Sequence, residues 1–292
     1  MTVVGHPFGW HLHVIWLLAV VTLVVGYLWA TTTWPATRRQ RALFVGGAVL
    51  LGLAVTWPLA DLAAHWLLVA LVLQRLLLLL AVPPLLVLGT PRPLLVRLTR
   101  PAGIDAVLRM VVRPIPAVAI VTVVAVATLT TGAVSLAARS SVAQAALELV
   151  VLAAGFVLWA PVLSELPGAP TLSALGRGGY LIVQSIVPSF LSIVWIFARH
   201  PLYQPFAHSG KVVDLSPLLD QQLSGFVAKL GTIAVLWSVA FVIMTRAEAA
   251  DSAGKDDDPL MWSDVEREIE RADRRQRRHG WRDLLPPPQD QS

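Results

Sequence analysis

The sequence contains no cysteine, and only 14% of its 292 residues are charged. The absence of cysteine excludes disulfide bonds, thiolate metal ligands and cysteine nucleophiles. The sequence also lacks a Ser/His/Asp set, a zinc-protease motif and a phosphate-binding loop, and we therefore predict that the protein is not an enzyme. The shortage of charge accompanies 56% hydrophobic residues and a mean hydropathy of +0.68, which excludes an ordinary soluble domain.

Long apolar runs predict an all-α, polytopic membrane protein. A helix needs about 20 apolar residues to cross the hydrocarbon core of a lipid bilayer. Seven segments approach that length, at about 12–31, 42–60, 66–89, 115–137, 142–164, 179–198 and 226–245. We therefore predict that residues 1–245 form a domain of seven transmembrane helices that is surrounded by lipid.

The distribution of basic residues predicts the orientation of these helices. Most of the 23 lysine and arginine residues fall in the links after the first, third and fifth segments and in the C-terminal tail. Cytoplasmic loops of membrane proteins carry such an excess, so we predict an N-terminus outside and a C-terminus in the cytoplasm. The same bias accounts for the net charge of +5, and we expect no nucleic-acid partner.

The residues after the last apolar segment differ in composition from the rest. Residues 246–292 are polar and rich in charge, as expected of a cytoplasmic tail. Within this tail, Ser263 and Glu266 have the spacing of a helix capping box. We therefore predict a short charged helix over about 263–278.

Histidine is distributed unevenly between the two predicted sides of the membrane. Six of the seven histidines lie on the outer side, and the candidate metal ligands among them are His11, His13, His65, His200 and His208. Neutral imidazole is the commonest metal ligand in proteins and suits copper and zinc. Alternatively, these side chains are polar anchors at the membrane interface, and the sequence leaves both interpretations open.

The longest predicted outer connection, residues 199–225, contains a polar run at the start of the last apolar segment. The run consists of Asp220, Gln221 and Gln222, and Ser216 before it fits the start of a helix. Helix capping explains Ser216 but leaves the Asp-Gln-Gln run unexplained. We therefore consider an ion or partner site here and count Asp220 among the candidate metal ligands.

Three charged side chains lie inside or at the edge of apolar segments: Arg75 in the third, Glu148 in the fifth and Lys229 near the start of the seventh. Arg75 and Glu148 are the two that could pair. Their segments are both predicted to run inward from the outside, and at 1.5 Å per residue the two depths differ by about 5 Å. A charge at membrane depth needs a partner or a water-filled cavity. We predict an Arg75–Glu148 ion pair, which would be either a lock between two helices or part of a proton or ion path.

Proline is expected to interrupt two of the predicted spans. Pro83-Pro84 should break the third span, and Pro188 should bend the sixth. Interrupted helices also occur at transporter binding sites, so a small-solute permease is an alternative function. The small number of polar residues within the spans argues against a path for a hydrophilic solute.

Four stretches of the sequence point together to one known family. They are QRLLLLLAVPPLLVLGTPRPL, GFVLWAPVL, RHPLYQPFA and LSPLLDQQLSGFVAK. In order and spacing, across nearly all of residues 10–245, they resemble the CtaG family of bacterial cytochrome c oxidase assembly factors. The resemblance implies a seven-span protein of the bacterial plasma membrane with cytochrome c oxidase subunits as partners. It also implies copper handling at the outer face, where the copper centre of the oxidase matures.

The chain departs from the family at several positions where relatives usually carry histidine. Leu71 and Arg75 stand at such positions in the third span, and Leu149 follows Glu148 where relatives have a further histidine. The resemblance therefore implies either copper handling through the outer histidines or a divergent scaffold without metal binding. In the scaffold, an Arg75–Glu148 salt bridge would replace a metal-bridged contact between helices.

Overall fold

The computed structural model describes residues 13–163, 172–186, 189–206, 215–256 and 266–274, and the regular structure of these ranges is helical throughout. The expectations placed on His11, Pro188, His208 and Ser263 concern residues outside these ranges. Contacts divide the chain into two units, Met1–Met244 and Thr245–Ser292. The described part of the second unit contains a helix over 266–274, inside the range predicted for the tail.

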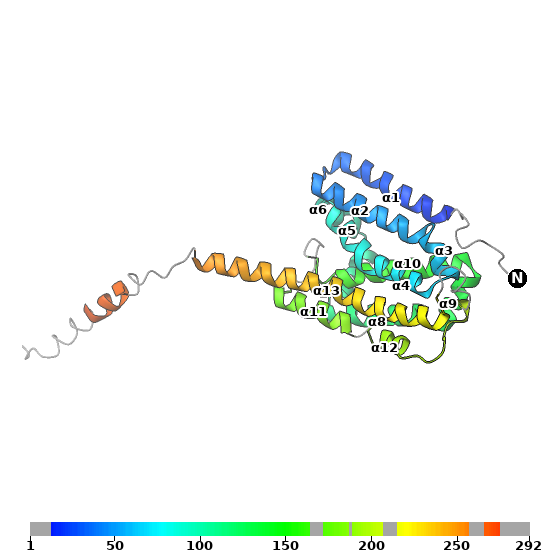
Figure 1. Cartoon of the computed structure of the whole chain (residues 1–292). Helices are drawn as coiled ribbons and strands as arrows, with labels where there is room; N and C mark the ends of the chain where they lie inside the picture. Colours follow the sequence, from blue (N-terminus) through cyan, green and yellow to red (C-terminus); the bar gives the residue numbers. More distant parts are fainter. Residues whose placement is uncertain (1–12, 164–171, 187–188, 207–214, 257–265, 275–292) are drawn as a thin grey trace, which may run out of the picture. The chain divides into compact units, whose positions relative to one another are not determined.

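The first half of the chain is made of short and long helices in sequence, which Figure 1 colours from blue to green. They are α1 (Val14–Thr33), α2 (Arg38–Val55), α3 (Leu59–His65), α4 (Leu68–Leu76), the π-helix η1 (Leu77–Ala81), α5 (Val82–Gly89), α6 (Arg92–Thr99) and α7 (Ala102–Val111). The remaining elements are α8 (Pro114–Thr128), α9 (Thr131–Arg139), α10 (Ser141–Trp159), α11 (Ala174–Ile186), α12 (Ser189–Ile196), the 3-10 helix η2 (Gln204–Phe206) and α13 (Pro217–Asp256).

Six helical segments within the described residues are long and apolar enough to cross a membrane. They are Val14–Thr33, Arg38–His65, Leu68–Gly89, Ser141–Trp159, Ala174–Ile196 and Pro217–Ala250. Gly103–Val111 and Pro114–Thr128, which meet at 97°, would make a seventh if the bent pair counts as one span. The difference from the predicted seven thus arises at the fourth segment.

The predicted fourth segment, 115–137, is divided into two helices. α8 ends at Thr128, and α9 begins afresh after Thr130, whose side chain accepts a hydrogen bond from the Ala133 N–H at 3.3 Å. A threonine side chain in this position caps a new helix rather than continuing the previous one. Apolar composition alone gave no indication of this break, because the residues on both sides are hydrophobic.

The predicted interruption at Pro83-Pro84 is only a local irregularity: Leu68–Gly89 runs as one helical span, in which the π-helix η1 lies between α4 and α5 just before the prolines. Proline has no N–H, so the carbonyl groups one turn earlier lose their usual donors. Gly155 of α10 lies directly against this stretch. A Cβ atom on Gly155 would be 2.6 Å from Pro83 Cγ and 2.8 Å from the carbonyl oxygen of Leu78. The missing side chain therefore allows α10 to cover the irregular backbone.

A second close approach joins α1, α2 and α5. The hydroxyl of Tyr27 donates a hydrogen bond to the carbonyl of Gly89 at 2.9 Å, and its ring stacks on Phe44 with the centroids 3.6 Å apart. A Cβ atom on Gly89 would lie 2.7 Å from Phe44 Cα. These contacts attach α1 to the bundle, while its other side exposes Ile15 and Trp29, which suits contact with lipid.

We predict that Gly155→Ala lowers the stability of the bundle by about 1–3 kcal/mol, because the added methyl group has no space against η1. The measurement is thermal or denaturant unfolding of the protein in detergent micelles. Gly46→Ala on α2 is the matched control, since a Cβ there meets nothing within 4 Å. The control should be neutral or slightly stabilising. Equal effects of the two substitutions would contradict the close packing of α10 against η1.

Candidate functional site

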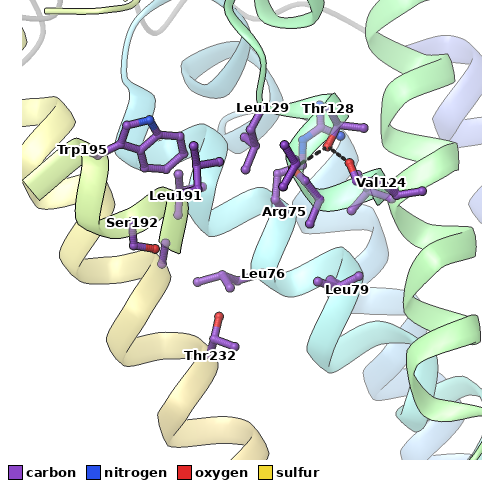
Figure 2. Close-up of a pocket in the computed structure, with 15 residues that line it drawn as sticks. Arg75, Leu76, Leu79, Val124, Thr128, Leu129, Leu191, Ser192, Trp195 and Thr232 are labelled. Carbon is purple, nitrogen blue, oxygen red and sulfur yellow. Dashed lines mark hydrogen bonds between the residues drawn. The ribbon is translucent and has the colours of Figure 1, made fainter. Parts of the chain in front are cut away.

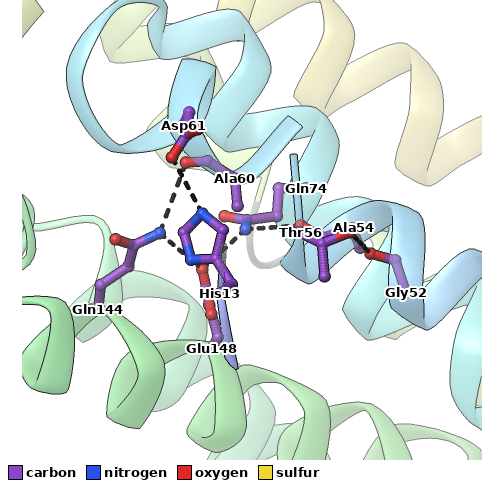
Figure 3. A network of polar contacts seen from close by, with 9 residues as sticks. All are labelled: His13, Gly52, Ala54, Thr56, Ala60, Asp61, Gln74, Gln144 and Glu148. Atoms are coloured by element: carbon purple, nitrogen blue, oxygen red, sulfur yellow. Dashed lines mark hydrogen bonds and ion pairs between the residues drawn. The ribbon is translucent and has the colours of Figure 1, made fainter. Parts of the chain in front are cut away.

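Polar side chains collect at one end of the first unit, which we call the Asp61 end. The helices α1, α4, α10 and α13 all begin there, and α3 lies beside α9. Figure 3 shows the polar network at this end, made of His13, Asp61, Gln74, Gln144 and Glu148. These five residues belong to four different helices or helix ends, so the network joins segments that are distant in sequence.

His13 and Asp61 form a partly exposed pair within the polar network. The two side chains retain 20% and 12% of their accessible surface, and His13 Nε2 lies 2.9 Å from Asp61 Oδ1. His13 immediately precedes α1, and Asp61 is in the first turn of α3. The contact therefore fixes the start of α1 to the short helix that follows α2.

Gln74 connects three helices through one amide group. Its Nε2 donates to the carbonyl of Ala54 and to Glu148 Oε1, both at 2.8 Å. Ala54 lies at the end of α2, and the residue four positions later is Pro58, which has no N–H to offer to that carbonyl. The side chain of Gln74 supplies the missing donor. It thereby links α4 to α2 and α10.

Glu148 is held by amide groups rather than by arginine. Its side chain is 1% exposed, and Oε1 also accepts a hydrogen bond from Gln144 Nε2 at 3.0 Å, one turn earlier on α10. Gln144 Nε2 reaches the carbonyl of Ala60 as well, at 3.5 Å. The carboxylate therefore accepts hydrogen bonds from two neutral amide groups. A buried carboxylate needs such partners, because it has no contact with water.

Arg75 lies close enough to Glu148 for the two charges to interact, but not as an ion pair in direct contact. Within the described ranges, no Arg75 nitrogen comes within 4.0 Å of a Glu148 oxygen. Arg75 is 7% exposed, and its Nε and Nη1 have no hydrogen-bond partner among the residues that the structure describes. The electrostatic interaction with Glu148 therefore acts through space.

Asp220 caps a helix to which it does not belong. Its Oδ2 accepts the Leu68 N–H at 2.8 Å, and its Oδ1 accepts the Val69 N–H at 3.1 Å, so the carboxylate of α13 closes the N-terminus of α4. The residue in the capping position of α4 is Leu67, which cannot accept such bonds. Asp220 is fully buried, and a carboxylate at this position also compensates the helix dipole.

The two glutamines after Asp220 extend this function to other backbone groups. Gln221 Oε1 accepts the Leu202 N–H at 2.7 Å, and Gln222 Nε2 donates to the carbonyl of Ala198 at 3.3 Å, just beyond α12. Gly225 lets α13 approach α12, because a Cβ there would lie 2.8 Å from the carbonyl oxygen of Ser192. The Asp-Gln-Gln run is thus a set of remote caps.

The segment that contains Tyr203 packs onto the same end, as its aromatic residues suggest. Tyr203 and Phe206 are 5% and 2% exposed, and the Tyr203 hydroxyl donates to the carbonyl of Leu129 at the end of α8. Burial raises the pKa of the Tyr203 hydroxyl to about 12, so it remains a donor at physiological pH. Trp195 meets its ring edge-on, with the centroids 5.8 Å apart.

The structure separates the candidate metal ligands into different environments. His65 is exposed at the end of α3, one turn after Asp61, whereas His200 is exposed in the segment after α12. His11 and His208 lie outside the described residues. Asp61 was absent from the sequence-based set, and its spacing of four residues before His65 on an apolar helix was the signal that could have identified it.

Comparison with known proteins then decides the family. The family model described as cytochrome c oxidase caa3 assembly factor (Caa3_CtaG) matches residues 8–248. The chain belongs to the Caa3_CtaG family. No curated protein and no solved structure matches it.

Membership in the Caa3_CtaG family indicates a cytochrome c oxidase assembly factor and implies association with the oxidase. Together with the six to seven apolar helices, it identifies a multi-pass membrane protein. The matched range ends at residue 248, close to the boundary of the first unit at Met244.

We predict that Asp220→Ala lowers the stability by about 3 kcal/mol, because one buried and one partly buried N–H group lose their acceptor. Asp220→Asn keeps one carbonyl acceptor and should lose less. Asp105→Ala is the matched control, since Asp105 only pairs with Arg109 one turn later on α7, and its loss should stay within about 0.5 kcal/mol. Unfolding in detergent measures all three, and equal losses for Asp220→Ala and Asp105→Ala would reject the remote cap.

Double-mutant cycles can separate the two possible partners of Glu148. We expect Gln74→Leu and Glu148→Leu to couple by about 1–3 kcal/mol, because they share a hydrogen bond to a buried carboxylate. Arg75→Leu and Glu148→Leu should couple more weakly, because that interaction has no direct contact. Additive losses for Gln74→Leu and Glu148→Leu, or a stronger coupling between Arg75→Leu and Glu148→Leu, would show that the Arg75–Glu148 ion pair is the principal contact between the helices.

Proposed function

We propose that this chain assists the maturation of a copper centre of cytochrome c oxidase at the outer face of the plasma membrane, without catalysing a reaction itself. The family membership supports the partner, and the His13–Asp61 contact at 2.9 Å supports a role for the Asp61 end. Copper would be the cargo of this protein, passed on to an oxidase subunit.

The outward orientation of the Asp61 end is supported by the distribution of charge. The helices α1, α4, α10 and α13 begin at this end, whereas the predicted cytoplasmic links with their arginine residues lie at their other ends. Basic residues favour the cytoplasmic side. His13, His65 and His200 then face the compartment in which an exposed copper centre is built.

The geometry of His13 suits a metal ligand. Histidines that bind metals commonly donate their other ring N–H to a carboxylate, which fixes the tautomer and the orientation of the ring. Asp61 Oδ1 is at hydrogen-bond distance from Nε2, so Nδ1 would carry the free lone pair. His65, one turn beyond Asp61 on α3, adds an exposed imidazole to the same helix.

The described residues supply only part of a copper site. They contain no group of three or more His, Cys, Asp or Glu side chains that could hold a metal ion. Further ligands would therefore come from elsewhere, such as His11 or the oxidase subunit that receives the metal. Both oxygens of Asp220 already accept N–H groups, so we leave that residue out of the proposed set. An incomplete site suits a protein that hands its metal on.

A scaffold without metal binding is the alternative, and one observation favours it. Gln74 and Glu148 join α2, α4 and α10 entirely through hydrogen bonds. The helices therefore need no metal at the position where relatives usually carry histidine and this chain has Arg75. In this alternative, the Asp61 end would hold an oxidase subunit during its assembly.

We predict that the purified protein binds about one equivalent of Cu(I) and that His13→Ala together with His65→Ala lowers the affinity at least tenfold. Competition with a coloured Cu(I) chelator measures the affinity. His200→Ala is the matched control, because His200 is exposed in a different segment, and its affinity should stay unchanged. Without stoichiometric binding, or with binding that does not depend on His11, His13 and His65, the copper proposal fails.

The cellular test distinguishes the two versions of the assembly role. Deletion of the gene should lower both the copper content and the activity of the terminal oxidase, and the unaltered gene should restore them. If the His13/His65 double variant restores both as well as the unaltered gene does, the scaffold alternative is correct. If deletion leaves the oxidase unchanged, neither version holds.

A further inference from the structure

The bundle contains a cavity beside Arg75 that the assembly role does not explain. Its volume is about 70 Å³, and side chains of α4, η1, α8, α10, α12 and α13 form its walls. Figure 2 shows Arg75 at one side of the cavity next to Thr128, with Ser192 and Thr232 among the other labelled residues. Apart from these four polar side chains, the lining is apolar.

Arg75 brings an incompletely bonded positive charge to this cavity. The side chain is 7% exposed, and Nε and Nη1 have no partner among the described residues. A guanidinium remains charged at ordinary pH, and it is costly at membrane depth without a partner or water. Unfilled N–H groups next to a cavity therefore point to an occupant of that cavity.

The local carboxylate does not fill this role. Glu148 accepts two hydrogen bonds from the amides of Gln74 and Gln144, and it is not in direct contact with the guanidinium. The residues that line the cavity include no aspartate or glutamate. The hydroxyl of Thr128 already donates to the carbonyl of Val124 at 2.8 Å, whereas the hydroxyls of Ser192 and Thr232 can donate to an acceptor in the cavity.

The size of the cavity restricts the occupant to something small. One water molecule needs roughly 10–15 Å³ of such space, so about 70 Å³ admits a few waters or one small ion. Water would satisfy the N–H groups but would leave Glu148, which acts only through space, as the nearby compensating charge. A monovalent anion satisfies the N–H groups and compensates the charge directly, and its attraction to the guanidinium is strong where the surroundings are apolar.

We propose that the Arg75 cavity binds one small monovalent anion, such as a halide or formate, with the guanidinium as its main ligand. The hydroxyls of Ser192 and Thr232 complete the polar surroundings. The anion connects α4 with α8, α12 and α13, whereas the polar network connects α4 with α2 and α10. This site is independent of the copper proposal, because none of its residues is a proposed copper ligand.

The direct test uses bromide as the probe. Crystals or lipid-phase crystals of the full chain grown with sodium bromide should show an anomalous-scattering peak beside Arg75. In detergent, replacing gluconate by bromide at constant ionic strength should raise the Tm, by about 4 °C at ten times the Kd. The absence of the peak together with equal Tm values in the two salts would show that water fills the cavity and would overturn the proposal.

Variants assign the effect to the site. Arg75→Gln should abolish the bromide-dependent rise in Tm, and Arg139→Gln, which changes an exposed arginine on α9, should keep it. Thr232→Val removes one hydroxyl without changing the charge, and it should weaken the bromide-dependent rise in Tm several-fold. This variant provides the test if Arg75→Gln fails to fold. A response that survives in both Arg75→Gln and Thr232→Val would place the bromide elsewhere and reject the cavity as its site.

Discussion

The constraint on which this structure depends is that backbone groups at membrane depth have no water to bond with, and the chain interrupts its helices there several times. Each interruption leaves N–H or C=O groups without partners. Asp220 accepts hydrogen bonds from the first two N–H groups of α4. Gln74 donates to the carbonyl of Ala54, which has no usual donor because Pro58 lacks an N–H. Gly155 brings α10 against the irregular stretch around Pro83. The fold is therefore held together at its breaks by residues that are distant in sequence.

The same requirement organises the end of the bundle to which we assign the function. Polar side chains that satisfy broken helices also fix the start of α1 against α3, and they place His13 beside Asp61. A rigid, partly exposed pair of this kind can present an imidazole to a metal or to a subunit.

The sequence predicted the helical membrane architecture, an irregular helix near Pro83-Pro84 and the family, because each depends on composition or on a local pattern. It failed at the fourth span, where a cap by Thr130 splits the predicted segment into α8 and α9. It left the Asp-Gln-Gln run unexplained, because the groups that this run caps are up to 152 residues away. The lack of a capping residue before Leu68 was the one local sign that a remote cap was needed.

Matched depth brought Arg75 and Glu148 together in the sequence-based prediction, and the structure does place them within electrostatic reach. Depth alone cannot decide which side chains touch, because rotation of each helix and competition from neighbouring amides determine the contacts. Gln74 and Gln144 occupy the carboxylate, and the guanidinium lies beside a cavity. The sequence by itself thus determined which segments cross the membrane, since this depends on their length and hydrophobicity. Only the tertiary structure decided how they pair, since pairing depends on helix positions that no local pattern encodes.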